Sequence, residues 1–387
     1  MKKGVSDSTT AVHAGRDPAS NHGIVNPPVY HASTVLFPSY ADVKKPTQRV
    51  VYGRRGTPTT FALEDAVLAL EGGHGCAVVP SGLAAITTAL LALVGSGDRI
   101  LVPDSAYGPT RRFCDTLLRR MGVETVYYDP LLGGAIADLI DDRTRVVFVE
   151  SPGSLTFEVQ DVPAIAAAAR ARGARTVIDN TWASPLFFKP FEHGCDVSIQ
   201  AATKYIVGHA DAMLGTVTAN EETWPAIQAA HGELGLCAGP DDMYLALRGL
   251  RTIDVRLKRH MQQGIELAEW LEGRPEVDRV LHPALPSHPG HALWKRDFRG
   301  ASGLFAAILK PCEEDALAAM LDGLELFGMG YSWGGFESLV VPAYPARMRT
   351  AVPWSEEGQL LRFHVGLEDV EDLKADLAAG FARLAAA

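Results

Sequence analysis

The feature that most constrains the fold is an alternation of short apolar runs with helical patterns between residues 59 and 250. The runs are rich in β-branched residues and cover residues 76–79, 100–102, 146–149, 176–178 and 197–199. Strands that are apolar throughout are typical of a sheet buried on both faces, and helical connections are typical of parallel strands. The pattern therefore predicts an α/β fold with a mainly parallel central sheet.

The chain has 387 residues, enough for two domains. Residues 1–58 are rich in Pro, Gly, Ser and Thr without sustained periodicity, so we expect an extended arm that reaches a neighbouring subunit. Residues 59–250 form the predicted large, cofactor-binding domain. A single long helix over 241–271 is expected to lead into a smaller C-terminal α/β domain, residues 251–387, with strands near 303–309 and 361–365 and a closing helix over 370–384.

Charge and cysteine content exclude several classes of protein. With 36 Lys and Arg against 46 Asp and Glu, the net charge is −10, which argues against a nucleic-acid partner. The five cysteines lie 38 or more residues apart, so no metal-binding pair is expected and a reducing cytoplasm fits. We find no secretory signal and no run of 18 apolar residues, so we expect a cytoplasmic protein without a membrane segment.

Asp179 and Lys204 carry the main chemical signal. Asp179 ends the apolar run Val177-Ile178, and Lys204 follows the next run beside Thr203. Ligands of such sheets bind beyond the carboxyl ends of the strands. Pyridoxal phosphate (PLP) needs a lysine for its aldehyde and a carboxylate for its ring nitrogen. The alternatives are a surface lysine and an aspartate that caps the following turn.

Two further strand ends carry candidate residues. Ser81, Gly82 and Leu83 open a predicted helix, whose free N–H groups suit a phosphate. Tyr107 lies in the loop after the 100–102 strand and is placed to stack on a planar cofactor. An ordinary strand-to-helix turn and a core or loop aromatic are the corresponding alternatives.

Three residues away from these strand ends are also candidates. Tyr52 and Arg54 lie two apart on the arm, so their side chains point the same way and suit a phosphate; a solvated loop is the alternative. Arg362 lies in a predicted strand, where a guanidinium suits bidentate binding of an α-carboxylate. The alternative for Arg362 is a salt bridge to Glu368 or Asp369.

The chain resembles the Cys/Met-metabolism PLP-dependent enzymes of fold type I over nearly its whole length. The most specific stretch is residues 196–211, and supporting stretches are residues 52–57, 150–154, 331–338 and 362–369. The resemblance implies an aspartate-aminotransferase-like fold with PLP as cofactor. It also implies a homo-oligomer, usually a dimer of dimers, whose active sites are shared between subunits.

The resemblance also implies a role for each candidate. Lys204 would bind PLP and act as acid and base, Asp179 would pair with the ring nitrogen, and Tyr107 would stack on the ring. The phosphate would be held by Gly82, Leu83 and Thr203, with Tyr52 and Arg54 arriving from a neighbouring subunit. The substrate would be bound by Arg362, Ser332 and Tyr107, and the catalytic set would be Lys204, Tyr107 and Tyr52.

The reaction implied by the resemblance is β-elimination from an L-cysteine thioether. L-Cystathionine would give L-homocysteine, pyruvate and ammonia, and cystine or cysteine are further candidate substrates. Ala201, where many relatives carry serine, and Ser154-Leu155, where many γ-acting relatives carry Asn-Pro, favour this β-lyase branch. The alternatives are a γ-acting enzyme of the family and, more remotely, a non-enzymatic PLP-fold binding or regulatory protein.

Overall fold

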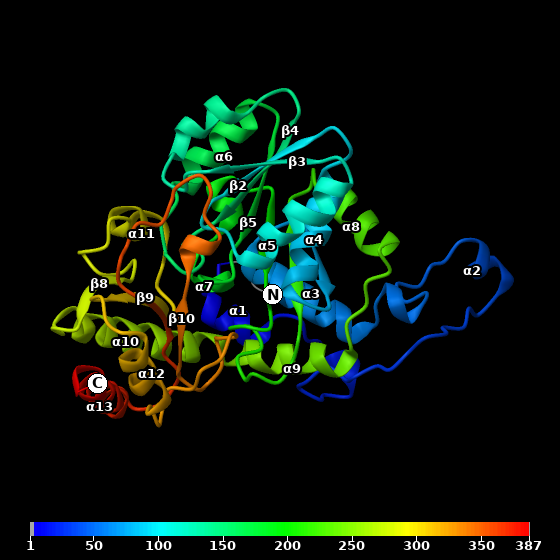
Figure 1. Ribbon diagram of the computed structural model, residues 1–387. Coiled ribbons are helices and arrows are strands. Elements are labelled where there is room, and N and C mark those ends of the chain that lie inside the picture. The colour runs from blue at the N-terminus through cyan, green and yellow to red at the C-terminus, as the bar shows by residue number, and fades with distance from the viewer. Residues whose placement is uncertain (1–3, 387) are drawn as a thin grey trace.

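The computed structural model describes residues 4–386, and its largest feature is a seven-stranded sheet (Figure 1). The strand order is β1-β7-β6-β5-β4-β2-β3, and all neighbours are parallel except β7, which is antiparallel to both β1 and β6. The mainly parallel sheet predicted from the sequence is confirmed. Its strands are β1 (Gly75–Val79), β2 (Arg99–Pro103), β3 (Glu124–Tyr128), β4 (Thr144–Glu150), β5 (Arg175–Asp179), β6 (Val197–Gln200) and β7 (Gly215–Ala219).

Helices cover both faces of this sheet because successive strand residues point to opposite sides. Ile178 packs on one face and Val177 on the other, each in its own apolar cluster. The Ile178 face is covered by α3 (Pro58–Glu71), α6 (Val162–Ala171) and α7 (Ser184–Phe187). The Val177 face is covered by α4 (Gly82–Leu93), α5 (Gly108–Phe113) and α8 (Trp224–Glu233).

A second, smaller sheet lies in the C-terminal part of the chain. Its order is β10-β11-β9-β8, and every pair is antiparallel. Its strands are β8 (Val277–Leu281), β9 (Leu304–Leu309), β10 (Leu339–Ala343) and β11 (Leu360–His364). A third apolar cluster joins this sheet to α10 (Ile253–Glu272), α12 (Glu314–Asp322) and α13 (Val370–Ala386), while α11 (His291–Asp297) follows β8. We call the units around the two sheets the large and the small domain.

The prediction of one long helix over residues 241–271 is wrong. The chain forms α9 (Pro240–Arg251) and α10, which begins at Ile253. Thr252 lies between them with φ −111° and ψ 6°, outside the helical region. Its hydroxyl bonds to Gly249 O at 3.1 Å, a local side-chain hydrogen bond that competes with the helical ladder.

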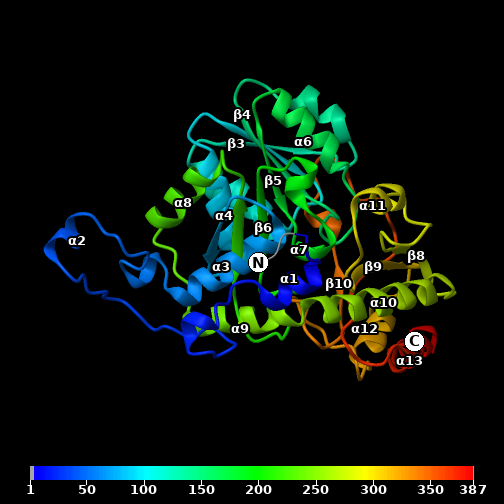
Figure 2. The same cartoon turned by 180° about the vertical axis from the view of Figure 1, so that it is seen from behind.

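The N-terminal segment has one anchored part and one projecting part (Figure 2). α1 (Asp7–His13) packs on the body of its own chain, where the Asp7 carboxylate lies 2.8 Å from Lys189 Nζ. The chain then projects as a long loop that contains α2 (Tyr40–Lys44) and exposes large apolar side chains at Ile24, Val25, Leu36, Tyr40 and Val43. Within residues 4–386, no helix combines the length and the apolar composition that crossing a membrane requires.

Candidate active site

The candidate site lies where β4, β5 and β6 reach their carboxyl ends. Glu150 ends β4 and pairs in register with Asp179, which ends β5. Lys204 follows β6, which ends at Gln200. Parallel strands bring their carboxyl ends to one edge of the sheet, so these three side chains share that edge.

Lys204 is the centre of the site. Its Nζ donates a hydrogen bond to Ser332 Oγ at 2.8 Å and lies 5.2 Å from the centroid of the Trp333 ring. Burial and the positive charge of Arg362 lower the pKa of Lys204, the negative charge of Asp179 raises it, and the net result is a pKa of about 8. A substantial fraction of the amine is therefore neutral near physiological pH, as attack on an aldehyde requires.

Asp179 faces Lys204 and also caps the next turn. Its Oδ1 accepts a hydrogen bond from the Thr181 N–H at 3.0 Å, so the capping alternative describes part of its role. Burial raises the pKa of Asp179, while hydrogen bonds from Thr181 and the charge of Lys204 lower it. A half-buried carboxylate here is stabilised by a positive partner, and a protonated pyridine nitrogen would be one. The residue fits the ring end of PLP.

Gly82 and Leu83 begin α4 and leave their N–H groups free of intrahelical bonds. Ser81 Oγ accepts from the Ala84 N–H at 3.0 Å and so caps the helix without using either group. A Cβ on Gly82 would lie 2.4 Å from Ala201 Cβ, so only glycine allows this approach. A helix N-terminus with bare backbone beside the Lys204 segment fits the phosphate of PLP.

The segment around Lys204 is held by contacts on both sides. The Thr203 hydroxyl accepts from the Leu214 N–H at 2.9 Å and donates to Leu214 O at 3.1 Å, which fixes the preceding turn. Gly334 adopts φ +86°, and a Cβ there would lie 3.0 Å from Lys204 Cα. The Gly334 N–H donates to His364 Nε2 at 3.1 Å. Thus the loop that carries Ser332 rests directly on the lysine.

Tyr107 lies at the start of α5, with 44% of its surface exposed. Its N–H donates to Glu150 Oε2 at 2.8 Å. Burial, together with the charges of Glu150 and Asp179, raises the pKa of the Tyr107 phenol. Burial and the charge of Asp179 raise the pKa of Glu150 well above its ordinary value. Sequence reasoning gave Glu150 no role, although its place at a strand end was a usable signal.

Arg362 comes from the small domain, in the central strand β11. Its Nη2 donates to Gly330 O and Tyr331 O, each at 3.1 Å. Its charge influences the pKa of both Lys204 and Tyr107, so the guanidinium faces the same site. The alternative salt bridge to Glu368 or Asp369 is not formed: Glu368 accepts hydrogen bonds from the N–H and O–H of Ser338, and Asp369 accepts one from the Glu371 N–H.

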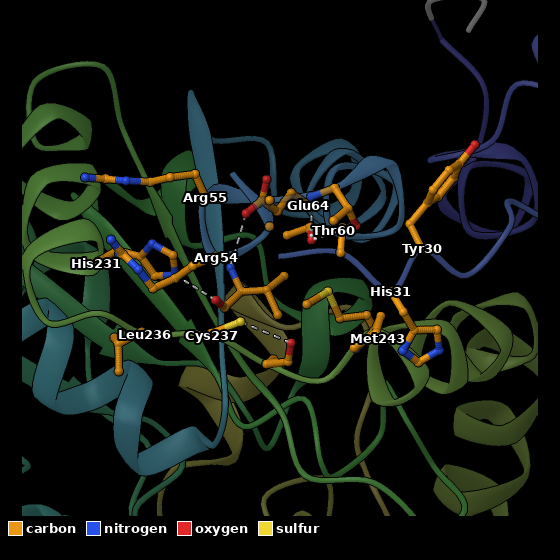
Figure 3. Close-up of a pocket in the computed structure, with 17 residues that line it drawn as sticks. Tyr30, His31, Arg54, Arg55, Thr60, Glu64, His231, Leu236, Cys237 and Met243 are labelled. Atoms are coloured by element: carbon orange, nitrogen blue, oxygen red, sulfur yellow. Dashed lines mark hydrogen bonds between the residues drawn. The ribbon is translucent and has the colours of Figure 1, made fainter. Parts of the chain in front are cut away.

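Tyr52 and Arg54 lie in a different part of the same chain. Arg54 Nη1 donates to Gly232 O at 2.9 Å, and the Tyr52 ring lies 5.9 Å from the guanidinium with 45% of the residue exposed. Among residues 4–386, no hydrogen bond or ion pair joins either residue to Lys204. Arg54 instead lines a cavity of about 200 Å³ together with Arg55 and His231. Figure 3 shows these side chains.

Together these features define an α/β enzyme of the PLP-dependent fold-type-I class, with a lysine, a carboxylate and a helix N-terminus whose first N–H groups are free near one sheet edge. The chain belongs to the Cys/Met metabolism PLP-dependent enzyme family, whose model matches residues 8–382. The cofactor prediction is thereby confirmed.

Individual relatives agree with this assignment. A Rhizobium johnstonii relative is 54% identical over 98% of this chain and 96% of its own length. Cystathionine beta-lyase MetC of Escherichia coli is 46% identical, covering 97% and 98%. The solved structure of cystathionine gamma synthase from Xanthomonas oryzae pv. oryzae with aminoacrylate and cysteine has a TM-score of 0.90 at 35% identity, covering 99% of each chain.

Proposed function

We propose that the chain is a PLP-dependent carbon–sulfur β-lyase that converts L-cystathionine and water into L-homocysteine, pyruvate and ammonia. The observation that carries the proposal is the position of Lys204, whose amine bonds to Ser332 and has a pKa that burial and Arg362 lower and Asp179 raises. Full-length similarity to an enzyme named cystathionine beta-lyase supports the choice of substrate.

Each residue has a role in this reaction. When bound, PLP supplies an aldehyde that captures the substrate amine and a ring that delocalises negative charge from Cα. Arg362 binds the α-carboxylate, and Ser332 orients Lys204 through the hydrogen bond to Nζ. The neutral amine of Lys204 removes the Cα proton and then delivers a proton to the leaving sulfur. Asp179 holds a proton on the ring nitrogen.

The proposal extends to a site shared between subunits. Tyr52 and Arg54 would reach the phosphate of a neighbouring copy from the arm, residues 1–58, and two such dimers would form a tetramer. The exposure of Leu36 (84%) and Tyr40 (74%) supports this, because apolar side chains on a projecting loop are stabilised when another surface covers them.

The proposal includes the domain boundaries at residues 58/59 and 250/251. It also places the protein in the cytoplasm, where its free cysteine thiols would stay reduced.

Product identification tests the proposal directly. Purified, PLP-loaded protein is incubated with L-cystathionine, and the oxo acid and thiol are identified by mass spectrometry. We expect pyruvate with homocysteine. The pair 2-oxobutyrate and cysteine would instead establish γ-elimination and refute the β-lyase assignment.

A variant identifies the residue responsible. Lys204→Ala should lose both the cofactor absorbance of the lysine adduct and turnover, because the substitution removes the amine that would condense with the aldehyde. Turnover near that of the wild type in Lys204→Ala would contradict the assignment. A protein that binds PLP through Lys204 yet converts no amino acid would favour the non-enzymatic alternative.

A further inference from the structure

A loop of the small domain crosses to the large domain beside the site. We call residues 344–359, which connect β10 to β11, the strap; in Figure 1 it is the orange segment that rises from β10 toward the large sheet. Its returning part stays with the small domain, where Glu356 pairs with Arg279. Its outer part binds the large domain at two places.

The first attachment is the Asp104 carboxylate, which follows β2 and is buried. It accepts hydrogen bonds from three consecutive N–H groups of the strap, Thr350 at 2.9 Å, Ala351 at 2.9 Å and Val352 at 2.7 Å. Arg111 Nη1 donates to the same carboxylate at 2.8 Å. Hydrogen bonds to an ionised carboxylate are among the stronger kinds, so this attachment is specific.

The second attachment is Arg349, whose guanidinium pairs with Glu158 and donates to Thr156 Oγ1 at 2.6 Å. Next to it, the strap lies against the start of α5. A Cβ on Gly108 would be only 3.0 Å from Met348 Sδ. The strap is therefore in contact with the residue that directly follows Tyr107.

The contact between Asp104 and the strap connects the part of the site that holds Tyr107 with the part that holds Arg362. Asp104 lies three residues before Tyr107 in the same turn, and the strap continues into β11, which carries Arg362. We propose that Asp104 is a positioning residue: by holding the strap, it sets the place of Arg362 relative to Tyr107 and so determines affinity for the α-carboxylate of the substrate. This inference rests on the proposed role of Arg362.

Asp104→Asn tests the proposal because asparagine keeps the size but removes the charge that three N–H groups and Arg111 share. Steady-state constants for L-cystathionine are measured with two competitive inhibitors. 3-(Methylthio)propanoate has the carboxylate without the amine, and 2-(methylthio)ethylamine has the amine without the carboxylate. We expect KM and the inhibition constant of the propanoate to rise at least about tenfold. This is the change in affinity that corresponds to the loss of one charge-assisted hydrogen bond. The kcat and the inhibition constant of the amine should stay within about threefold.

A matched control separates positioning from general weakening of the domain contact. Asp161→Asn removes another charge pair between the domains, since Asp161 lies 2.7 Å from Arg296 of α11 and, among residues 4–386, has no hydrogen bond or ion pair with the strap. We expect this control to keep wild-type constants for both inhibitors. Trypsin cleavage after Arg347, followed in the apoprotein, should speed up in Asp104→Asn only.

If Asp104→Asn does not fold, Arg349→Gln tests the positioning role instead, because it releases the second attachment of the strap. It should raise KM for L-cystathionine and the inhibition constant of the propanoate. Faster trypsin cleavage with unchanged constants would overturn the proposal and leave the strap a purely structural contact. Arg362→Gln shows which of the two proposals is wrong. If it raises the inhibition constant of the propanoate while Asp104→Asn and Arg349→Gln do not, only the positioning role of Asp104 is refuted. If Arg362→Gln leaves the inhibition constant of the propanoate unchanged, the proposed binding of the α-carboxylate by Arg362 is itself refuted.

Discussion

Gly82→Ala gives the sharpest test of the proposed phosphate cradle, the N-terminus of α4 at Gly82 and Leu83. A Cβ at this position would lie 2.4 Å from Ala201 Cβ and 2.9 Å from Ala201 Cα, whereas carbon atoms pack at about 3.5–4.0 Å. The start of α4 must therefore move away from the Lys204 segment by about 1 Å. Overpacking of this kind costs about 1–3 kcal/mol. If the strain is relieved at the cradle, PLP should dissociate roughly 5- to 150-fold more readily.

The assay is an absorbance titration of apoprotein with PLP, with the midpoint of thermal unfolding measured in parallel. Gly95→Ala is the matched control, because it follows the other end of α4 and its Cβ would meet Asp98 Oδ2 at an ordinary 3.7 Å. We expect the control to bind PLP like the wild type. A Gly82→Ala protein with wild-type PLP affinity and thermal midpoint would refute the reasoning.

Three further predictions address the site and the arm. Reconstitution of apoprotein with PLP should accelerate as pH rises through about 8, because only the neutral amine of Lys204 attacks the aldehyde; a rate independent of pH in stopped-flow absorbance would count against this. Asp179→Asn should lower kcat about 10²–10³-fold in steady-state assays, with Lys204 still reacting with PLP. Leu36→Asp with Tyr40→Ser should shift light-scattering mass toward smaller species, and a monomeric wild type would contradict the role of the arm.

Much of the large domain was predictable because its strands are apolar on both faces. The runs at 100–102, 146–149 and 197–199 lie in β2, β4 and β6, and the alternation with helices fixes a mainly parallel sheet. β3 and β7 were missed. β7 reads Gly-Thr-Val-Thr-Ala, whose small and hydroxyl-bearing residues give no apolar run, although every residue is buried. Only tertiary packing identifies it as a strand.

The site was predictable to the extent that its residues follow strands. Asp179 and Tyr107 could be placed at one sheet edge because parallel strands end together. The contact of Lys204 with Ser332 spans 128 residues and joins two domains, and no periodicity encodes such a pairing. Asp104 was missed for the same reason, since its partners are backbone N–H groups of the strap, which any residue except proline provides.

The reactivity of Lys204 shows why placing residues is not sufficient. Burial and Arg362 lower its pKa, and Asp179 raises it, so the value of about 8 is a sum of opposing effects. Asp179 comes from β5 and Arg362 from β11, on separate sheets. The sequence identifies each charge, but the size of each effect depends on distance and on the water excluded between the domains. The nucleophilicity of Lys204 therefore depends on how the two domains assemble, although each contributing residue can be identified in the sequence.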